Sequence, residues 1–365
     1  MKSSTAPSLP ARSLRWSEAL ANYGATMAVL AAGIWFYTRV GGYHRNELSG
    51  ELAIRLGGAV MQVRTADLLV WLGWAYALIL LPYYAVLPGV VSKARIAFAY
   101  LLGQFFAAQR PRFGSEERQA FLALALKLFF VPLMLNWLLS LGADVAGHWR
   151  GLAASAPGSS FLTTFNTHLY LLLFKLLLMV DVALFTVGYV IEIPVLGNEI
   201  RTVDPTVSGW VVCLACYPPF NIALNAFFPW QATDFPAFSN VAVHVALNCA
   251  ILASMAIYAS ASVTLGLRAS NLTNRGIVRG GPYAWVRHPA YAAKNLAWWI
   301  GALPALWAAF AQSMGSGLWA LASVAAWTTI YVLRALTEER HLLLLDNGYS
   351  QYMENVPYRF VPKLC

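Results

Sequence analysis

The chain has 365 residues, of which 59% are hydrophobic and only 11% are charged, and its mean hydropathy is +0.57. Soluble domains carry roughly 25% charged residues, so this composition excludes a globular protein whose whole surface meets water. It predicts an integral membrane protein. The formal net charge is +9. The sequence has no compact basic domain or base-stacking motif, so we assign that charge to arginines at cytoplasmic helix ends and headgroups and expect no nucleic-acid partner.

Apolar runs close to or above the length that crosses a bilayer, about 20 residues, recur along the chain. Together they predict an all-α, polytopic, multi-pass protein with about eight transmembrane helices. The fifth run contains Pro218-Pro219, where we expect a kink or a break because proline interrupts helical hydrogen bonding. The predicted helices cover about residues 19–39, 68–91, 120–142, 161–191, 208–228, 240–266, 289–312 and 317–336.

Lysine and arginine predict which loops face the cytoplasm. Loops 92–119 and 267–288 are rich in these residues, and positively charged loops are retained on the cytoplasmic side. We therefore expect loop 267–288 and the C-terminus to face the cytoplasm. The first external loop, with Arg45, Arg55 and Arg64, departs from this trend.

A change in composition divides the chain near residue 235. Residues 1–235 hold apolar helices with scattered polar groups and form a transmembrane region of unknown role. Residues 236–365 hold loops rich in charged and turn residues, and we expect the chemistry there. Lys175 and Asp181 lie inside an apolar run, where a charge costs about 2.5–3.5 kcal/mol. For these two we favour snorkelling or an interhelical pair over a substrate pathway.

The cysteines give no sign of a metal or redox site. Cys213 and Cys216 form a C-x-x-C pattern, but it lies inside an apolar run without a second pair. We interpret these two, with Cys249 and Cys365, as small buried apolar side chains, and we expect no metal.

The loop before the seventh predicted helix is unusual for a membrane protein. It contains GGPYAWVRHPAYAAKNL, from Gly280 to Leu296. Glycine and proline at 280–282 predict a tight turn, and Pro289 predicts the first turn of the next helix. Arg287 and His288 would then lie at a helix N-terminus, where free N–H groups and the helix dipole favour an anion.

Two interpretations of this loop remain open on residue types alone. In the first, Arg287 clamps a carboxylate or phosphate, and Tyr283, Trp285 and Tyr291 provide flat faces for a ring-containing ligand. In the second, the loop is a cytoplasmic anchor, with arginines at lipid headgroups and aromatic residues in the interfacial belt.

An acidic pair follows the last predicted helix. The last two predicted helices are joined by a short turn, so they form an antiparallel hairpin that returns Glu338-Glu339 to the level of Arg287-His288. Two acids and a basic cluster are expected to meet at one membrane edge. Arg334 precedes Glu338 by four residues, so an ordinary pair on the helix surface is the alternative.

These motifs, taken in order, resemble the isoprenylcysteine carboxyl methyltransferase and phospholipid methyltransferase superfamily. The resemblance covers about residues 260–362. Ala293 and Asn347 depart from the family pattern, which has glycine and phenylalanine there. The matching residues are Gly281-Pro282-Tyr283, Arg287-His288-Pro289, Tyr291, Glu338-Glu339, Leu342, Gly348, Tyr349 (displaced by two), Tyr352 and Val356-Pro357.

The resemblance implies a membrane methyltransferase that binds S-adenosylmethionine in a cytoplasm-facing pocket closed by the C-terminal segment. The acceptor would be a lipophilic or small molecule that carries a carboxylate, thiol or amine. A lipophilic acceptor would enter from the membrane lipid. An in-line transfer from a sulfonium requires no protein nucleophile. The implied catalytic residues are Arg287, Glu338 and Glu339, and the implied cofactor-binding residues are Gly281, Pro282, Tyr283, Arg287, His288, Pro289, Tyr291, Glu338, Glu339 and Tyr352.

Two other functions remain open. An NADPH-dependent membrane reductase of the sterol reductase type carries a similar R-H-P-x-Y segment, and Arg268, Arg275, Arg279 and Arg287 would suit its 2′-phosphate. The long N-terminal half also fits a transporter or a non-catalytic scaffold, although the chain shows no internal repeat of the kind common in transporters.

Overall fold

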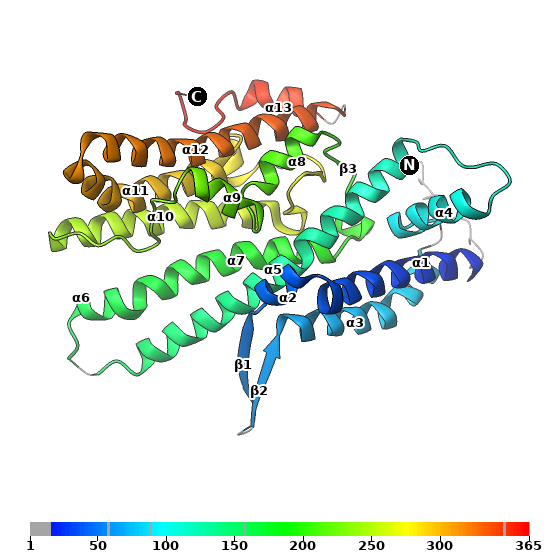
Figure 1. Ribbon diagram of the computed structural model, residues 1–365, viewed down its shortest axis with the longest axis horizontal. Helices are drawn as coiled ribbons and strands as arrows, with labels where there is room; N and C mark the ends of the chain where they lie inside the picture. Colours follow the sequence, from blue (N-terminus) through cyan, green and yellow to red (C-terminus); the bar gives the residue numbers. More distant parts are fainter. Residues whose placement is uncertain (1–15, 57–58, 88, 157, 346–347, 365) are drawn as a thin grey trace, which may run out of the picture. The chain divides into compact units, whose positions relative to one another are not determined.

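The computed structural model describes residues 16–56, 59–87, 89–156, 158–345 and 348–364. Helices make up 73% of the structure, with two two-stranded sheets among the described residues. The predicted all-α membrane fold is confirmed (Figure 1). The chain forms two compact units, one of residues up to Ser49 with Arg64–Leu128 and one of Gly50–Val63 with Phe129–Cys365.

The first unit contains α1, which packs against α3 and α4. Asn22 of α1 fixes the segment before α4, donating to the Val90 carbonyl at 2.8 Å and accepting from the Ser92 N–H at 2.8 Å. Its elements are α1 (Trp16–Trp35), the π-helix η1 (Phe36–Val40), α2 (Gly42–Glu47), α3 (Thr65–Val86), α4 (Lys93–Phe106) and the start of α5 (Ser115–Ala153).

The second unit contains the rest of α5 and all later elements. These are the hairpin β1 (Glu51–Leu56) and β2 (Ala59–Arg64), α6 (Phe161–Thr164), η2 (Phe165–Leu169), α7 (Tyr170–Val190), η3 (Pro194–Leu196), β3 (Thr202–Val203), α8 (Val207–Leu214), α9 (Phe220–Phe227), α10 (Val241–Leu265), η4 (Gly266–Arg268), β4 (Thr273–Asn274), η5 (Gly281–Ala284), α11 (Pro289–Gln312), α12 (Met314–Leu343) and α13 (Tyr349–Asn355).

Six helical segments of the described chain are long and apolar enough to cross a membrane. They coincide with the first, second, third, fourth, sixth and eighth predicted helices, over Trp16–Val40, Thr65–Val86, Ser115–Ala153, Phe161–Val190, Val241–Arg268 and Met314–Leu343. The seventh is α11, whose polar residues Lys294 and Asn295 lower its hydropathy. The fifth is two short helices, α8 and α9, which flank Pro218-Pro219, so the expected break is confirmed.

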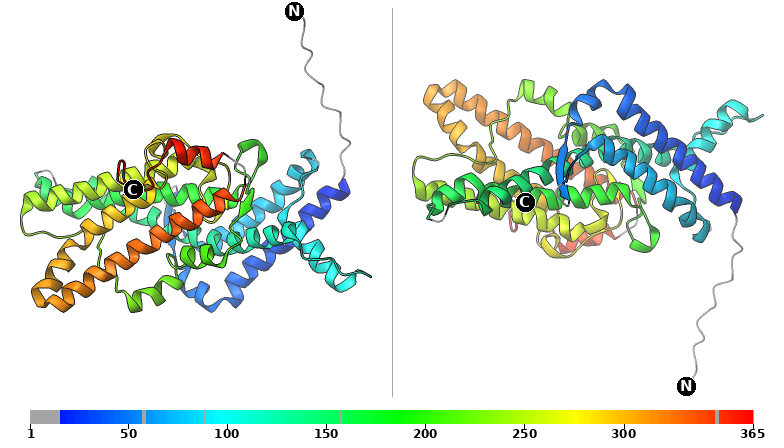
Figure 2. Two further views of the ribbon diagram at one scale, coloured as in Figure 1. Left: turned by 90° about the horizontal axis from the view of Figure 1, so that it is seen from above. Right: turned by 90° about the horizontal axis from the view of Figure 1, so that it is seen from below.

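Neighbouring helices of the second unit pack side by side. Figures 1 and 2 show α10 against α7 and against α11, and α11 against α12. Between α7 and α10, Tyr170 and Phe174 pack with Ile251 and Met255, all buried, and Ala297 of α11 completes this core. The small side chain at 297 lets α11 approach closely, as small residues do between membrane helices.

The last two long helices form the antiparallel hairpin that the sequence predicts. Ser313 separates them and caps α12, its Oγ accepting from the Ser316 N–H at 3.0 Å. Trp299 of α11 donates to the hydroxyl of Thr328 on α12 at 3.0 Å, which fixes the register of the pair. The hairpin therefore carries the C-terminal end of α12 back to the start of α11.

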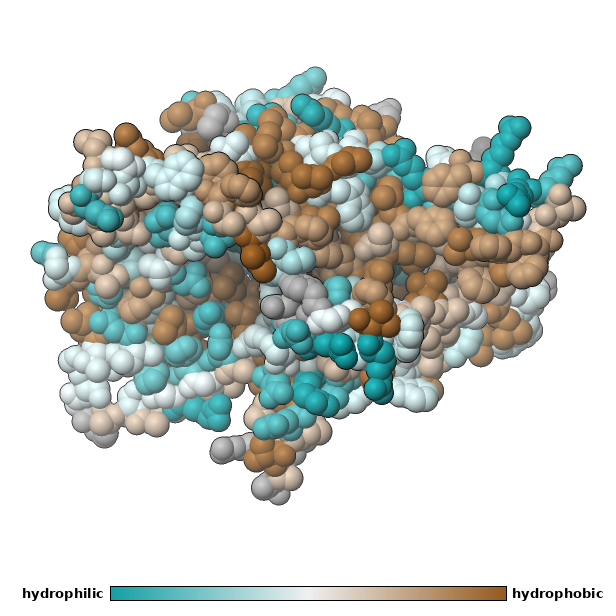
Figure 3. All heavy atoms as spheres, viewed as in Figure 1, coloured by the Kyte–Doolittle hydropathy of each residue, from teal (hydrophilic) through white to brown (hydrophobic). Residues whose placement is uncertain are grey.

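The surface of the helices is apolar over large areas (Figure 3). Leu78 of α3 is 75% exposed and Trp307 of α11 is 80% exposed. Large side chains of this kind are costly in water and stable against lipid tails. The exposed apolar side chains and the six long helices agree with an integral, multi-pass membrane protein.

Candidate active site

A buried carboxylate joins the start of α11 to the end of α12. Arg287 Nε donates to Glu339 Oε1 at 2.8 Å, and Arg359 Nη2 donates to Glu339 Oε2 at 2.7 Å. His288 Nε2 lies 3.2 Å from the same Oε1. These four residues are called the Glu339 cluster below. Two guanidinium groups and an imidazole therefore engage Glu339, which is only 4% exposed.

The Arg287-His288 motif also holds the C-terminal segment. Arg287 Nη1 donates to the carbonyls of Val356, at 2.8 Å, and Pro357, at 2.6 Å. The backbone N–H of His288 donates to the Arg359 carbonyl at 2.9 Å. Because backbone as well as side-chain bonds are involved, the segment after α13 is fixed against the start of α11.

The glycine-proline turn at residues 280–282 provides a second point of attachment for the C-terminal part of the chain. Gly281 has φ +55°, and a Cβ there would lie 2.5 Å from Thr264 Oγ1, so glycine is required. The following helical turn presents the carbonyl of Tyr283, which accepts from the Tyr352 hydroxyl at 2.7 Å. Burial raises the pKa of Tyr352 to about 12, so this hydroxyl keeps its proton at neutral pH.

The neighbouring acid, Glu338, has different surroundings. It accepts a short hydrogen bond from the Tyr291 hydroxyl and lies 3.7 Å from Arg334 Nη2 and 3.8 Å from His288 Nδ1. The Arg334–Glu338 pair, given above as the alternative, is therefore present, but Arg334 is buried and does not lie on the helix surface. Unlike Glu339, the side chain of Glu338 is 28% exposed and borders a cavity.

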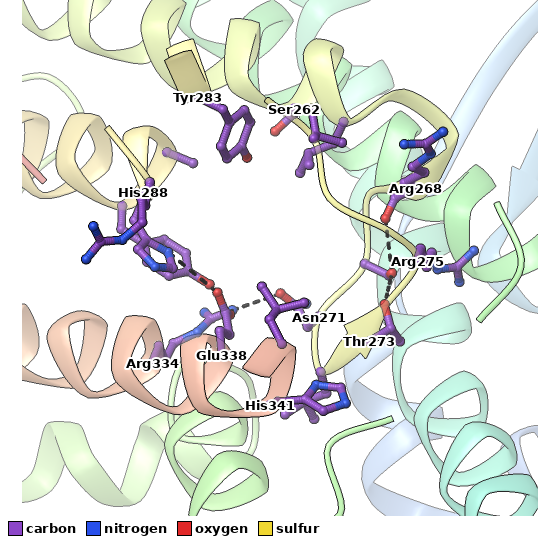
Figure 4. A pocket seen from close by; sticks show the side chains of 18 of the residues that line it. Ser262, Arg268, Asn271, Thr273, Arg275, Tyr283, His288, Arg334, Glu338 and His341 are labelled. Carbon is purple, nitrogen blue, oxygen red and sulfur yellow. Dashed lines mark hydrogen bonds and ion pairs between the residues drawn. The ribbon is translucent and has the colours of Figure 1, made fainter. Parts of the chain in front are cut away.

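We call this space, of about 190 Å³, the first cavity. In Figure 4, Tyr283 and Ser262 lie on one side of it and Glu338 and Arg334 on the other. The predicted site residues that line it are Tyr283, Arg287, His288, Tyr291, Glu338 and Tyr352; Gly281, Pro282 and Pro289 shape the adjoining backbone, and Glu339 lies behind the wall in its cluster.

Residues before the predicted division at 235 also line the first cavity. Asp181 of α7 is 7% exposed and accepts from the Tyr258 hydroxyl at 2.6 Å and, through a short bond, from Ser262. Asp204 and Tyr217 are further examples. The sequence signal for Asp181 was its charge within an apolar run, which we interpreted as snorkelling or an interhelical pair.

The interhelical pair is confirmed for Lys175, the other charged residue of that run, since its Nζ lies 3.5 Å from Asp144 Oδ2 of α5.

Lys294 of α11 is a site residue that sequence reasoning missed. It lines the first cavity together with Asp181.

A second cavity, of about 450 Å³, adjoins the first. Lys294 and Tyr331 line both. Aromatic contacts continue through the second cavity: the Trp230 ring centroid lies 4.7 Å from that of Trp298, which lies 5.0 Å from that of Tyr331. The remaining lining residues are Cys216, Asn221, Ile222, Asn225 and Trp327.

Within the part of the chain that the structure describes, no group of three or more His, Cys, Asp or Glu side chains is arranged to hold a metal ion. Cys213 is buried as expected and Cys216 is half-buried. The expectation of burial is wrong for Cys249, which is exposed on a helix long enough to span a membrane, where lipid accommodates an apolar thiol. Cys365 lies outside the described residues.

The fold and the site define an integral membrane protein whose polar cavity lies between a helical hairpin and a C-terminal segment held by Arg287. Residues 241–343 match the model of the isoprenylcysteine carboxyl methyltransferase (ICMT) family. The match confirms the resemblance of the C-terminal part and indicates a membrane methyltransferase. No curated protein and no solved structure matches the chain.

Proposed function

We propose that this protein is an S-adenosylmethionine-dependent methyltransferase that acts on a lipophilic or small acceptor in the membrane. One observation carries the proposal: the first cavity combines three carboxylates, those of Asp181, Asp204 and Glu338, with the rings of Tyr283 and Tyr291. The methyl donor has a sulfonium and an ammonium group, and cations of both kinds favour carboxylates and aromatic faces. The residues present therefore fit this cofactor.

We propose different roles for the two adjacent acids, Glu338 and Glu339. Glu338 borders the cavity and is our candidate to accept from the amino group or a ribose hydroxyl of the donor. Glu339 is engaged by three basic side chains, so we propose that it positions Arg287 and the C-terminal segment.

The role of Arg287 is more complex than a simple clamp. Its Nε and Nη1 bond to Glu339 and to two backbone carbonyls, while the residue still lines the first cavity. We propose that it holds the wall in place and presents positive charge to the methionine carboxylate. His288, Tyr291 and Tyr352 would complete the wall.

The bound donor supplies a methyl group already activated by its sulfonium. The chain's task is to align the acceptor with that methyl group and to keep water away. Alignment of reactants can lower a barrier by about 7–11 kcal/mol. The contact between Tyr352 and Tyr283, together with the Glu339 cluster, holds the C-terminal segment at the cavity, and we propose that this segment keeps water from the reacting groups.

We further propose that residues 1–235 are not separate from the chemistry, because Asp181 and Tyr217 line the same cavity as the family-matched residues. The basic loop 267–288 places the donor site at the cytoplasmic face in this proposal.

A labelled methyl donor tests the proposal directly. Membranes containing the protein are incubated with methyl-labelled S-adenosylmethionine and a lipid extract, and the organic phase is counted. We expect label in that phase for the wild type and a large loss for Glu338→Gln. No transfer above membranes lacking the protein would contradict a methyltransferase acting on such lipids, and equal transfer by Glu338→Gln would remove Glu338 from the site.

A further inference from the structure

Lys294 is a cation that borders both cavities and has no polar partner. Among the described residues it forms no hydrogen bond and no ion pair. Its Nζ instead lies over three aromatic rings, 5.4 Å from the centroid of Tyr258, 5.5 Å from that of Trp298 and 5.9 Å from that of Tyr331. Such rings stabilise an ammonium group, but they do not neutralise its charge.

An anion is the missing counterpart. A buried charge is costly unless an opposite charge or hydrogen bonds compensate it. Asp181 and Asp234 interact with Lys294 electrostatically, but neither forms an ion pair with it, and the Asp181 carboxylate accepts from the hydroxyls of Tyr258 and Ser262. Lys294 lines both cavities, so a ligand bound there can supply a negative charge in direct contact with it.

The residues that line the second cavity indicate the chemistry of the rest of that ligand. Its walls are the indole rings of Trp230, Trp298 and Trp327, which favour a flat or apolar body. Asn221 also lines this cavity, and its buried Oδ1 has no hydrogen-bond partner among the described residues. A buried amide oxygen without a partner is a second, independent sign of a polar ligand group, one that can donate a hydrogen bond.

We infer that Lys294 positions the acceptor, and that the acceptor is an apolar or aromatic molecule whose nucleophile is an anion at neutral pH. The body of the acceptor occupies the second cavity, and its anion lies at Lys294, where the two cavities meet. This inference rests on the proposed function, because the first cavity must hold the methyl donor.

The charges of this arrangement balance. A lone pair of the anionic oxygen or sulfur forms a bond to the methyl carbon, and the carbon–sulfonium bond breaks with its electrons returning to sulfur. The products are a neutral methylated acceptor and a neutral thioether. The anion that pairs with Lys294 is consumed, so the product binds Lys294 more weakly than the substrate and leaves.

Two aromatic probes of equal shape and opposite charge test the inference: 2-naphthoate and 2-naphthylmethylamine. Binding to the purified protein saturated with S-adenosylhomocysteine is followed by thermal shift and by tryptophan fluorescence. We expect 2-naphthoate to bind and the amine not to bind. Equal or tighter binding of the amine would overturn the inference without any variant.

The matched variants are Lys294→Met and Lys175→Met. Lys175 pairs with Asp144 and lines neither cavity, so its variant should bind 2-naphthoate like the wild type. Lys294→Met should lose about tenfold or more in affinity, because a charge-assisted bond is removed, and Lys294→Arg should restore part of it. An unchanged affinity in Lys294→Met would contradict the inference.

The response to S-adenosylhomocysteine separates the possible failures. If Lys294→Met keeps that response and loses 2-naphthoate, the inference holds. If it loses the response while Lys294→Arg keeps it, Lys294 binds the carboxylate of the donor instead, and the inference is wrong. If the wild type itself shows no response, the proposed function fails, while the two probes still report on Lys294. Should Lys294→Met not fold, Lys294→Gln must weaken 2-naphthoate binding, because it also removes the charge.

Discussion

Arg287 Nε lies 2.8 Å from Glu339 Oε1, with 6% and 5% of the two side chains exposed. The two residues stand 52 positions apart and meet because α11 and α12 fold back on each other. This contact links the start of one helix, the end of the next and, through Val356, the C-terminal segment. It determines which side chains remain available to the first cavity.

Arg287→Ala should destabilise the protein as well as weaken cofactor binding. Removing one partner of a buried ion pair leaves an uncompensated charge, which costs about 3–5 kcal/mol. The melting temperature in detergent, measured without ligand, should fall clearly. Arg359→Ala is the matched control: its side chain is 30% exposed, so a smaller fall is expected. An unchanged melting temperature in Arg287→Ala would show that the pair does not support the fold.

The same substitution should affect ligand binding at one of the two adjacent glutamates and thermal stability at the other. Glu338→Gln should lower the melting temperature of the free protein only a little, because its contact with Arg334 is 3.7 Å long and its side chain is 28% exposed. It should weaken S-adenosylhomocysteine binding, by about one order of magnitude for one charge-assisted bond. Glu339→Gln should lower the melting temperature, because Arg287 and Arg359 lose their counter-charge. Calorimetry and thermal melts on both variants decide this. Loss of binding in Glu339→Gln alone, with Glu338→Gln unaffected, would reverse the assigned roles.

Tyr352→Phe removes the hydrogen bond to the Tyr283 carbonyl and should cost about 0.5–1.5 kcal/mol. Because burial raises the pKa of Tyr352 to about 12, above the ordinary value of about 10, its contribution is present below pH 10 and is lost as the pH rises toward 12. Between pH 6 and 9 the difference in melting temperature between variant and wild type should therefore stay constant. Tyr358→Phe serves as control. A difference that vanishes by pH 8 would mean that the hydroxyl titrates there.

Cysteine labelling tests the predicted topology. Gly280 is exposed, has a negative φ, and a Cβ there meets no atom within 4 Å, so Gly280→Cys should fold normally in a background that carries Cys249→Ser and Cys365→Ser. An impermeant thiol reagent should label it only after the cells are opened. Ser159→Cys, in a predicted external loop, should be labelled in intact cells. The reverse pattern would place the cavity on the outer side.

The sequence predicted the proximity of the motifs but not their separate roles. Two glycines and two prolines predicted the turns, and a short connection predicted the hairpin that brings Glu338 and Glu339 to Arg287. Successive residues of a helix point about 100° apart, so one glutamate borders the cavity and the other lies in the Glu339 cluster. Which one does which depends on the rotation of α12, and residue order does not specify that.

Long-range packing explains the residues that were missed. Asp181 and Lys294 come from α7 and α11, and only the packing of α7 and α11 on α10 brings them to one cavity. The hairpin Glu51–Arg64 was also missed, within the loop taken as external. Its strands have β-branched residues and a Gly-Gly dipeptide between them, which is a hairpin signal that the search for apolar helices overlooked.

The most direct test compares two cofactors on the wild-type protein. S-adenosylhomocysteine and NADPH are titrated separately into the purified protein, and the melting temperature is recorded at each concentration. Asp181 and Glu338 line the first cavity and can engage the ammonium group of S-adenosylhomocysteine, which NADPH lacks. Arg268 and Arg275 line the same cavity and are the groups that would bind a 2′-phosphate if the protein were a reductase, so the two ligands separate the two functions. We expect a saturable rise with S-adenosylhomocysteine and none with NADPH. A rise with NADPH alone would contradict the methyltransferase proposal and favour the reductase.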